Sequence, residues 1–374
     1  MIRIILWSLF MLPLSALSQN TTEIYEQGLK LKSSRKTKEA LAKFQEVLKQ
    51  NPGYYQAQYE MGWCYNDLQN YPAAITALRS AKKDMSTIPK VYFELGYAFE
   101  KSTQYDSARA NYEKCKSLKP DYSNINKRIA YCYYSEEKHE LALTKFIEHS
   151  NQKANDSDYV YWYRRGFTEN ALKKYEDANK SLTYSKLYKN DYLNTYLELG
   201  YANTKLKQDE IAMSYFNKAI ELDPKSHVAY NGIAEIYRDN KKELIKAMEW
   251  YQKTLTIKPN ERKACFGIGY CLNSQQKYAE AVPYLTKAIE QEATYTAAFV
   301  ELGYSYFKLG KNAEAETNLL KAITLSPSNE NARFYLGYLY ISQNNKPKAQ
   351  QMANELKSLN SKNAAPLQEK INKL

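Results

Sequence analysis

The sequence predicts an all-α protein built as an α-solenoid of antiparallel helix pairs, and two columns of small residues carry this prediction. An alanine recurs ten times at intervals of 34 to 36 residues: Ala40, Ala74, Ala108, Ala142, Ala178, Ala212, Ala247, Ala281, Ala315 and Ala349. A second small residue stands twelve or thirteen positions before each alanine: Gly28, Gly62, Gly96, Ala130, Gly166, Gly200, Ala234, Gly269, Gly303 and Gly337. A fixed period of this length is typical of arrays whose repeats bury their apolar faces against one another.

Each repeat is expected to contain two helices. We number the repeat so that the first small residue is position 8 and the alanine is position 20. Positions 4, 7, 8 and 11 are apolar or small, as in the segment from Tyr92 to Phe99, and this spacing places them on one helix face. Positions 20, 24 and 27 form a second stripe, as in the segment from Ala212 to Ala219. Two such stripes facing each other predict an antiparallel pair.

The glycines have a structural explanation. Eight of the 12 glycines in the chain stand at position 8, inside a predicted helix. Glycine costs a helix about 1 kcal/mol relative to alanine, so its recurrence requires a close approach between the two helices. Glycines that hold a phosphate lie instead in a loop between a strand and a helix, which this position is not.

The first 18 residues have the pattern of a secretory signal peptide. Arg3 precedes an apolar run from Ile4 to Leu14, and Ala16-Leu17-Ser18 supplies small residues before Gln19. The run is shorter than the roughly 20 residues that a membrane helix needs. We therefore expect a signal peptide over residues 1–18, a mature chain from Gln19 with no transmembrane segment, and a periplasmic or secreted location; an uncleaved anchor is the alternative.

The five cysteines and three histidines do not suggest a metal site. Cys64, Cys132 and Cys271 each stand two residues after position 8, where other repeats have alanine or serine, so we expect them to pack in the core. A bridge between Cys115 and Cys132 remains an alternative. His139, His149 and His227 are scattered, and no pair of cysteines has the spacing of metal ligands. We expect no metal and no cofactor.

The repeat resembles the tetratricopeptide repeat family over about residues 21–363. The resemblance rests on the 34-residue period, the small residue at position 8, the alanine at position 20, an aromatic residue at position 11 and a proline at position 32. The aromatic residues are Tyr65, Phe99, Tyr133, Tyr237, Tyr306 and Tyr340, and the prolines are Pro52, Pro120, Pro224, Pro259 and Pro327. The resemblance implies a right-handed superhelix whose first helices line a concave groove for peptides or partner proteins. It also implies a protein without catalytic residues of its own.

Aromatic residues at two positions of the first helix are the candidate binding residues. Position 9 is aromatic in eight repeats: Trp63, Tyr97, Tyr131, Phe167, Tyr201, Tyr270, Tyr304 and Tyr338. Position 5 adds Tyr25, Tyr59, Phe93, Tyr163, Phe266 and Phe334, of which Tyr59, Phe93, Tyr163 and Phe266 complete the predicted groove. Tyrosine suits a binding surface because it offers a large area and a hydroxyl at a small entropic cost. The alternative is that both columns pack between neighbouring repeats.

The charge of the chain narrows the class of partner. The net charge of +12 favours acidic proteins or anionic surfaces. The carboxylate clamp of some family members needs Lys at position 5 and Asn at position 9, whereas Lys127 here is followed by Tyr131. We therefore expect extended segments with apolar or aromatic side chains rather than a terminal carboxylate. We expect no nucleic acid as partner, because an exported protein rarely meets it.

Three departures from the repeat pattern mark the chain. Residues 151–158 are polar and two residues longer than the other junctions, which suggests a joint between repeats. Repeat 7 has one extra residue around Asp239 to Leu244, which should lengthen the turn between its helices. Residues 364–374 follow the tenth repeat and are expected to form a capping helix through Leu367, Ile371 and Leu374.

These observations favour a non-enzymatic scaffold of the bacterial cell envelope that binds partner proteins or peptides in an aromatic groove. The alternative is an accessory subunit of a secretion, outer-membrane or cell-wall assembly, which docks through its convex face or its basic C-terminal end. An enzyme is disfavoured because no nucleophile, base or metal set stands outside the repeat pattern. The sequence leaves the partner's identity and the oligomeric state open.

Overall fold

The computed structural model describes residues 8–153 and 156–374, with side chains from Gln19 onward, and every regular element in these ranges is helical. The first helices of the ten repeats are α1 (Ser8–Ser33), α3 (Tyr55–Asp67), α5 (Pro89–Lys101), α7 (Ile125–Ser135), α9 (Tyr159–Ala171), α11 (Leu193–Lys205), α13 (His227–Glu235), α15 (Arg262–Ser274), α17 (Thr296–Lys308) and α19 (Glu330–Ser342). The second helices are α2 (Thr37–Gln50), α4 (Tyr71–Ala81), α6 (Tyr105–Leu118), α8 (His139–Gln152), α10 (Tyr175–Tyr188), α12 (Asp209–Leu222), α14 (Leu244–Ile257), α16 (Tyr278–Gln291), α18 (Asn312–Leu325) and α20 (Lys346–Ser358). The predicted all-α solenoid of helix pairs is confirmed.

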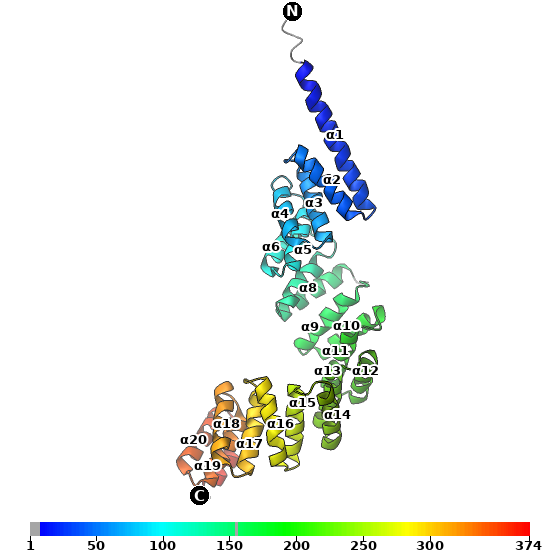
Figure 1. Cartoon of the computed structure of the whole chain (residues 1–374). Coiled ribbons are helices and arrows are strands. Elements are labelled where there is room, and N and C mark those ends of the chain that lie inside the picture. The colour runs from blue at the N-terminus through cyan, green and yellow to red at the C-terminus, as the bar shows by residue number, and fades with distance from the viewer. Residues whose placement is uncertain (1–7, 154–155) are drawn as a thin grey trace, which may run out of the picture. The chain divides into compact units, whose positions relative to one another are not determined.

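The chain divides into two compact parts, Met1–Tyr188 and Lys189–Leu374, which we call the N-terminal half and the C-terminal half. Within each half, the two helices of a repeat pack together, and the second helix packs on the first helix of the next repeat. First helices also touch one another, as α3 touches α5 and α15 touches α17. Figure 1 shows α15 to α20 stacked side by side in the C-terminal half. The first helices therefore share one face of each half.

The glycines of position 8 make room for the large side chain at position 24 of the same repeat. A Cβ atom on Gly96 would lie 2.6 Å from the ring of Tyr112, and one on Gly62 would lie 2.5 Å from Cγ of Leu78. The backbone is close as well, since a Cβ atom on Gly303 would lie 3.3 Å from the carbonyl oxygen of Ala315. The close approach predicted from the sequence is present, and the position-24 side chain is its main cause.

The turn inside each repeat contains one residue with left-handed backbone geometry. Its φ lies between 53° and 73° in all ten repeats, at Arg35, Gln69, Thr103, Glu137, Lys173, Lys207, Lys242, Gln276, Gly310 and Asn344. Glycine adopts this conformation without strain, whereas most other residues pay an energetic cost. Because Gly310 is the one glycine among the ten, no residue pattern in the sequence marks this geometry.

Repeat 7 absorbs its extra residue inside the first helix, so the predicted longer turn is wrong. Helix α13 ends at Glu235 and passes directly into a π-helical turn, η1 (Ile236–Asn240). Three residues, from Lys241 to Glu243, then precede α14, as three residues separate α11 from α12. A π-turn accommodates one additional residue by widening a helix locally. The connection therefore keeps the length that it has in other repeats.

A short helix, α21 (Ala364–Ile371), covers the last repeat. Leu367 and Ile371 are fully buried, whereas Leu374 lies beyond the helix and is exposed. A Cβ atom on Gly337 would lie 2.5 Å from Cδ2 of Leu367. Position 24 of the tenth repeat is the small residue Ala353, so Leu367 fills the space that the position-24 side chain fills elsewhere.

The predicted signal peptide falls only partly within the described residues. Residues 1–7 lie outside them, and residues 8–18 form the first part of α1, which continues to Ser33 without a break. Over the residues that the structure describes, no helix combines the length and the apolar character that a membrane span requires. Export and cleavage before Gln19 stay predictions.

Candidate functional site

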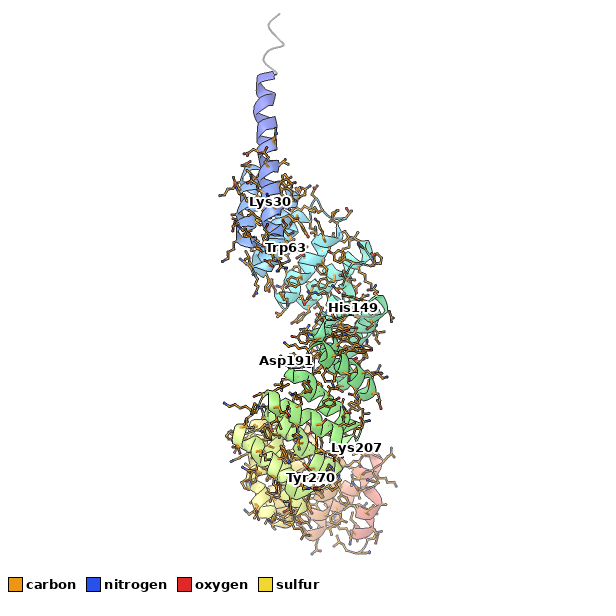
Figure 2. The ribbon with its side chains drawn as sticks, turned by 90° about the vertical axis from the view of Figure 1, so that its right-hand side faces the viewer. Lys30, Trp63, His149, Asp191, Lys207 and Tyr270 are labelled. Carbon is orange, nitrogen blue, oxygen red and sulfur yellow. The ribbon has the colours of Figure 1, made fainter. Side chains whose placement is uncertain are left out.

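The aromatic residues of position 9 lie on the first helices and differ in exposure. Tyr201 and Tyr270 are the most accessible, with 40% and 36% of their surface exposed. Tyr131 is buried, at 6%. The remaining five are half-buried: Trp63, Tyr97, Phe167, Tyr304 and Tyr338. Figure 2 labels Trp63 in the N-terminal half and Tyr270 in the C-terminal half. Seven of the eight rings thus keep some surface that a partner can contact.

The candidate residues at position 5 are less accessible. Tyr59 is buried, at 6% exposure, and the Nζ atom of Lys90 lies 4.3 Å from its ring centroid. Phe93, Tyr163 and Phe266 are half-buried. The ring of Phe93 packs 5.8 Å from that of Tyr112, a core residue. Tyr59 and Tyr131 therefore offer almost no surface to a partner, and the other ten predicted residues offer more.

Two neighbouring depressions lie on the first helices of the N-terminal half. The larger has a volume of about 500 Å³ and is lined by Trp63, Tyr71, Phe93 and Tyr97 together with polar residues that include Glu94. The smaller, of about 300 Å³, extends from α5 to α9, and its charged lining residues are Glu100, Lys101, Lys127, Arg128, Asp158 and Arg164. Phe93, Lys101 and Arg128 line both, so the two depressions adjoin. Lys127 is paired with Asp156 and Asp158, and Arg128 with Glu100, so Lys101 and Arg164 give the smaller depression its excess of positive charge.

Contacts between positions 12 and 6 join neighbouring first helices, and we call this series the 12–6 ladder. Asn66 Nδ2 donates to both the backbone oxygen and Oε2 of Glu94, at 3.1 and 2.8 Å. Asn273 Nδ2 donates in the same way to Glu301, at 3.0 and 2.9 Å. Further members are the ion pairs Lys32–Glu60 and Glu100–Arg128 and the stacking of Arg164 on Tyr134.

Cations of the ladder also cover aromatic rings of position 9. Lys32 Nζ lies 4.1 Å from the ring centroid of Trp63, the Arg128 guanidinium 5.0 Å from Tyr97, and the Arg164 guanidinium 4.2 Å from Tyr131. Each contact adds a cation–π attraction of about 0.5 to 2 kcal/mol, depending on how far the cation is desolvated. The N-terminal half therefore supplies its own cations to its position-9 rings.

The ladder carboxylates Glu94 and Glu301 differ in their electrostatic surroundings. Burial raises the pKa of both side chains, and the asparagine hydrogen bond partly opposes this rise. The charges of Lys32 and Arg128 also act on Glu94 and oppose the rise in its pKa, which stays above the usual value. No ion pair reaches Glu301 within the described ranges. Glu301 is thus a half-buried carboxylate without a compensating cation.

A buried polar cluster around Asp156 holds the C-terminal end of the 151–158 junction. Asp156 accepts from Lys127 Nζ at 2.9 Å and lies 2.7 Å from His149 Nε2. Its backbone oxygen accepts from Trp162 Nε1 at 2.7 Å. Burial raises the pKa of Asp156, but the bonds from Lys127 and His149 outweigh this and lower it to about 2. Residues 154–155 lie outside the described residues, so the joint stays a prediction.

The cysteines behave as core residues. All five are buried and free, with no disulfide among them. Desolvation raises the pKa of Cys271 to about 11, which keeps the thiol protonated. In residues 8–153 and 156–374, no three His, Cys, Asp or Glu side chains gather in a way that could hold a metal ion.

The sequence revealed the aromatic column but not the ladder. The column stands out because eight repeats have the same chemical type at position 9. The ladder pairs change their chemistry from repeat to repeat, from Lys–Glu to Asn–Glu to Glu–Arg. The available signal was the constant separation of 28 residues that joins Lys32 to Glu60, Asn66 to Glu94 and Glu100 to Arg128.

Sequence comparison finds repeat families along most of the chain. Models described as "Tetratricopeptide repeat" match residues 31–86, 89–122, 193–226, 227–261 and 263–295, and one described as "TPR repeat" matches residues 303–344. Tetratricopeptide repeat protein 37 of Xenopus laevis is 29% identical over 118 residues, which are 30% of this chain and 6% of that protein. The uncharacterized protein ycf37 of Pyropia yezoensis is 32% identical over 96 residues, which are 25% of this chain and 49% of that protein. The chain therefore spans less than half the length of each.

Solved structures share the fold. The Cut9–Hcn1 hetero-tetramer of APC/C superposes with a TM-score of 0.56 and 13% identity, over 94% of this chain and 76% of that chain. The C-terminal part of a TPR repeat-containing protein from Cytophaga hutchinsonii has a TM-score of 0.51 and 18% identity, over 65% and 99% of the two chains. PilW, a type IV pilus biogenesis factor, has a TM-score of 0.51 and 16% identity, over 57% and 99%.

Proposed function

We propose a protein-binding role for this chain, which belongs to the tetratricopeptide repeat family. It is a non-enzymatic scaffold that holds partner proteins or extended peptides against its first helices. The observation that carries the proposal is the larger depression of the N-terminal half, of about 500 Å³, lined by Trp63, Phe93 and Tyr97. Partly exposed aromatic rings beside polar groups are the composition of binding hot spots.

The charges suggest what such a partner carries. The smaller depression is positive through Lys101 and Arg164, because Lys127 and Arg128 already pair with carboxylates of the chain. An acidic side chain of the partner would gain charge-assisted hydrogen bonds there. We therefore propose a segment that places apolar or aromatic side chains in the larger depression and an acidic one in the smaller.

We also propose that the protein acts outside the inner membrane of a bacterial cell. The support is the sequence of residues 1–18, with its charged start, its apolar run of about 11 residues and its small residues before Gln19. Expression of the full chain in a bacterium, followed by cell fractionation and mass spectrometry of the N-terminus, tests this. An exported chain beginning at Gln19 supports export, whereas a cytoplasmic chain that keeps residues 1–18 contradicts it.

A capture experiment tests the binding role. Residues 19–374 are immobilised, exposed to envelope extract and compared with a Trp63→Ala, Tyr97→Ala, Tyr270→Ala variant. The control variant carries Leu187→Ala and Ile245→Ala, which remove exposed apolar side chains from second helices. Circular dichroism must show equal helicity in all three. Partners that disappear only with the aromatic variant support the proposal, and partners that persist with it contradict it.

A second role has its own observation. Large apolar side chains are exposed on second helices, with Leu187 at 70% and Ile245 at 71%, and Leu141 of α8 and Ile211 of α12 are also exposed. Exposed apolar side chains at such positions favour docking to a larger assembly. In that case the variant with Leu187→Ala and Ile245→Ala would lose the captured partners, or a variant without the basic residues near the C-terminus would. The aromatic variant would keep them.

A further inference from the structure

The carboxylate of Glu301 in the C-terminal half has no cationic partner among the described residues. It accepts one side-chain hydrogen bond, from Asn273 Nδ2 at 2.9 Å, while Asn273 Oδ1 in turn accepts from Ser305 Oγ at 2.7 Å. Burial raises its pKa. An ionised carboxylate that is desolvated and unpaired is energetically costly, and a bound cation would remove the cost.

Several tyrosine rings lie near this carboxylate. The ring centroids of Tyr304 and Tyr335 are 4.6 Å apart, and Tyr278 contacts Tyr304 edge-on at 5.8 Å. The charge of Glu301 acts on the phenols of both Tyr304 and Tyr335, and Tyr270 acts on Tyr335, so these groups lie close together. Tyr270 is 36% exposed and its position appears in Figure 2. Aromatic faces beside a carboxylate form a surface that attracts cations.

Two cations of the chain lie over these rings but do not pair with Glu301. The Arg238 guanidinium lies 5.7 Å from the ring centroid of Tyr270, and its Nε donates to Asp239 at 2.7 Å. Lys308 Nζ lies 5.6 Å from the ring centroid of Tyr304 on the same helix. Neither forms an ion pair with Glu301 in the described structure. The charge of Glu301 therefore remains uncompensated within the C-terminal half.

The N-terminal half contains the same arrangement with its cation supplied by the chain. Glu94 and Tyr97 occupy the positions of Glu301 and Tyr304, and Asn66 occupies that of Asn273. The next first helix places Arg128 at position 6, where its guanidinium covers Tyr97 at 5.0 Å and its charge lowers the pKa of Glu94. The matching residue after Glu301 is Tyr335, which brings a ring but no charge.

We propose that Glu301, with the rings of Tyr270, Tyr304 and Tyr335, binds a lysine or arginine side chain of the partner protein. This inference rests on the proposed binding role and adds to it the charge of one partner residue. The partner's cation supplies at Glu301 the charge that Arg128 supplies at Glu94. The occupant is a side chain of an extended segment, because the site lies on the first helices that carry the aromatic column.

The test uses residues 19–374 labelled with 3-fluorotyrosine and two probe peptides. Acetyl-Gly-Arg-Gly-amide carries the charge, and its citrulline analogue has nearly the same shape without it. We expect the arginine peptide to cause saturable fluorine shifts of Tyr270, Tyr304 and Tyr335, and the citrulline peptide to bind at least about tenfold more weakly. Equal binding of the two peptides would overturn the proposal.

Matched variants locate the site. Glu301→Gln keeps the hydrogen bond from Asn273 and should weaken the arginine peptide about tenfold, whereas Glu314→Gln, at an exposed position of α18, should leave it unchanged. Tyr335→Arg gives Glu301 an internal guanidinium, as Arg128 does for Glu94, and should block the peptide while the chain stays folded. Arginine binding that survives both Glu301→Gln and Tyr335→Arg would contradict the assignment.

The two proposals fail in different ways. If envelope partners are lost with the aromatic variant but retained by Glu301→Gln, the cation site is wrong and the binding role stands. If the arginine peptide binds through Glu301 while the wild-type chain captures no partner, the cation site stands and the binding role is wrong. The capture experiment therefore tests the binding role, and the peptide titration tests the cation site.

Discussion

At the scale of single residues, the chain keeps half-buried carboxylates beside its aromatic column. Glu94 and Glu301 each accept a hydrogen bond from an asparagine of the preceding repeat, and the charges of Lys32 and Arg128 also act on Glu94. Binding sites commonly retain such costly groups because a ligand compensates them. The position-9 rings differ from these carboxylates, because cation–π contacts and burial stabilise most of the rings in the free protein.

Glu301→Gln should stabilise the free protein at neutral pH. Burial raises the pKa of Glu301 in the folded state, so the folded chain binds this proton more tightly than the unfolded chain does. The free energy of unfolding therefore falls as pH rises from the unfolded pKa through the folded one. The variant lacks this decrease, so its free energy of unfolding at pH 7 should exceed that of the wild type by on the order of 1 kcal/mol.

Denaturant unfolding of wild type and Glu301→Gln between pH 4 and pH 8 measures this difference. The two curves should converge at the acidic end and separate toward neutrality. The opposite result is a Glu301→Gln variant that is less stable than the wild type at pH 7 and whose free energy of unfolding depends on pH as that of the wild type does. It would show that the carboxylate is already compensated in the free protein.

At the scale of elements, the sequence predicted the helix pairs well because two columns of small residues repeat through the whole chain. It failed at the turns and at repeat 7 for physical reasons. The left-handed turn position is filled by ordinary polar residues, such as Lys207 and Gln69, so no glycine marked it. The extra residue of repeat 7 could enter the turn or the helix, and the π-turn preserves the spacing of the turn that follows.

Thr103→Gly should stabilise the third repeat. Thr103 is β-branched and adopts φ of 58°, and this conformation strains an L-residue by about 1 kcal/mol. Glycine removes the strain, but its larger conformational entropy in the unfolded chain offsets part of the stabilisation. We expect a net gain of about 0.5 kcal/mol. Thr183→Gly, inside α10, is the control and should lose about 1 kcal/mol. A loss of stability for Thr103→Gly in thermal unfolding would rule out strain at this turn.

Leu367→Ala should destabilise the end of the array. Leu367 is fully buried against the tenth repeat and replaces its missing position-24 side chain, so truncation leaves a cavity costing about 2 to 5 kcal/mol. Hydrogen exchange should accelerate first in α19 and α20, because each repeat is stabilised chiefly by its neighbours. Leu374→Ala, at an exposed position, should leave exchange unchanged. Unaltered protection of α19 in Leu367→Ala would contradict a capping role for α21.

At the scale of the whole molecule, stability is expected to depend on coupling between successive repeats. The 12–6 ladder provides such coupling on the first helices, and the buried cluster of Lys127, His149 and Asp156 provides it at the junction before α9. The aromatic column could be recognised from the sequence because its chemical type repeats. The cluster could not, because its members stand at unrelated repeat positions and no other repeat has the same set.

Asp156→Asn should open the 151–158 junction to proteolysis. The aspartate compensates Lys127, and its removal leaves that ammonium group buried with Asp158 as its remaining partner, at 3.2 Å. We expect limited proteolysis to cut the variant at this junction several times faster than wild type, yielding two helical fragments. Asp223→Asn, in the junction after α12, is the control. Equal cleavage of wild type and Asp156→Asn would show that the cluster does not hold the junction.

The account as a whole depends on which face of the array meets a partner. Photo-crosslinking in envelope extract tests this directly, with benzoylphenylalanine placed at position 97 on a first helix or at position 187 on a second helix. The account predicts that a partner is crosslinked from position 97 and not from position 187. Crosslinking from position 187 alone would contradict it and assign binding to the second helices.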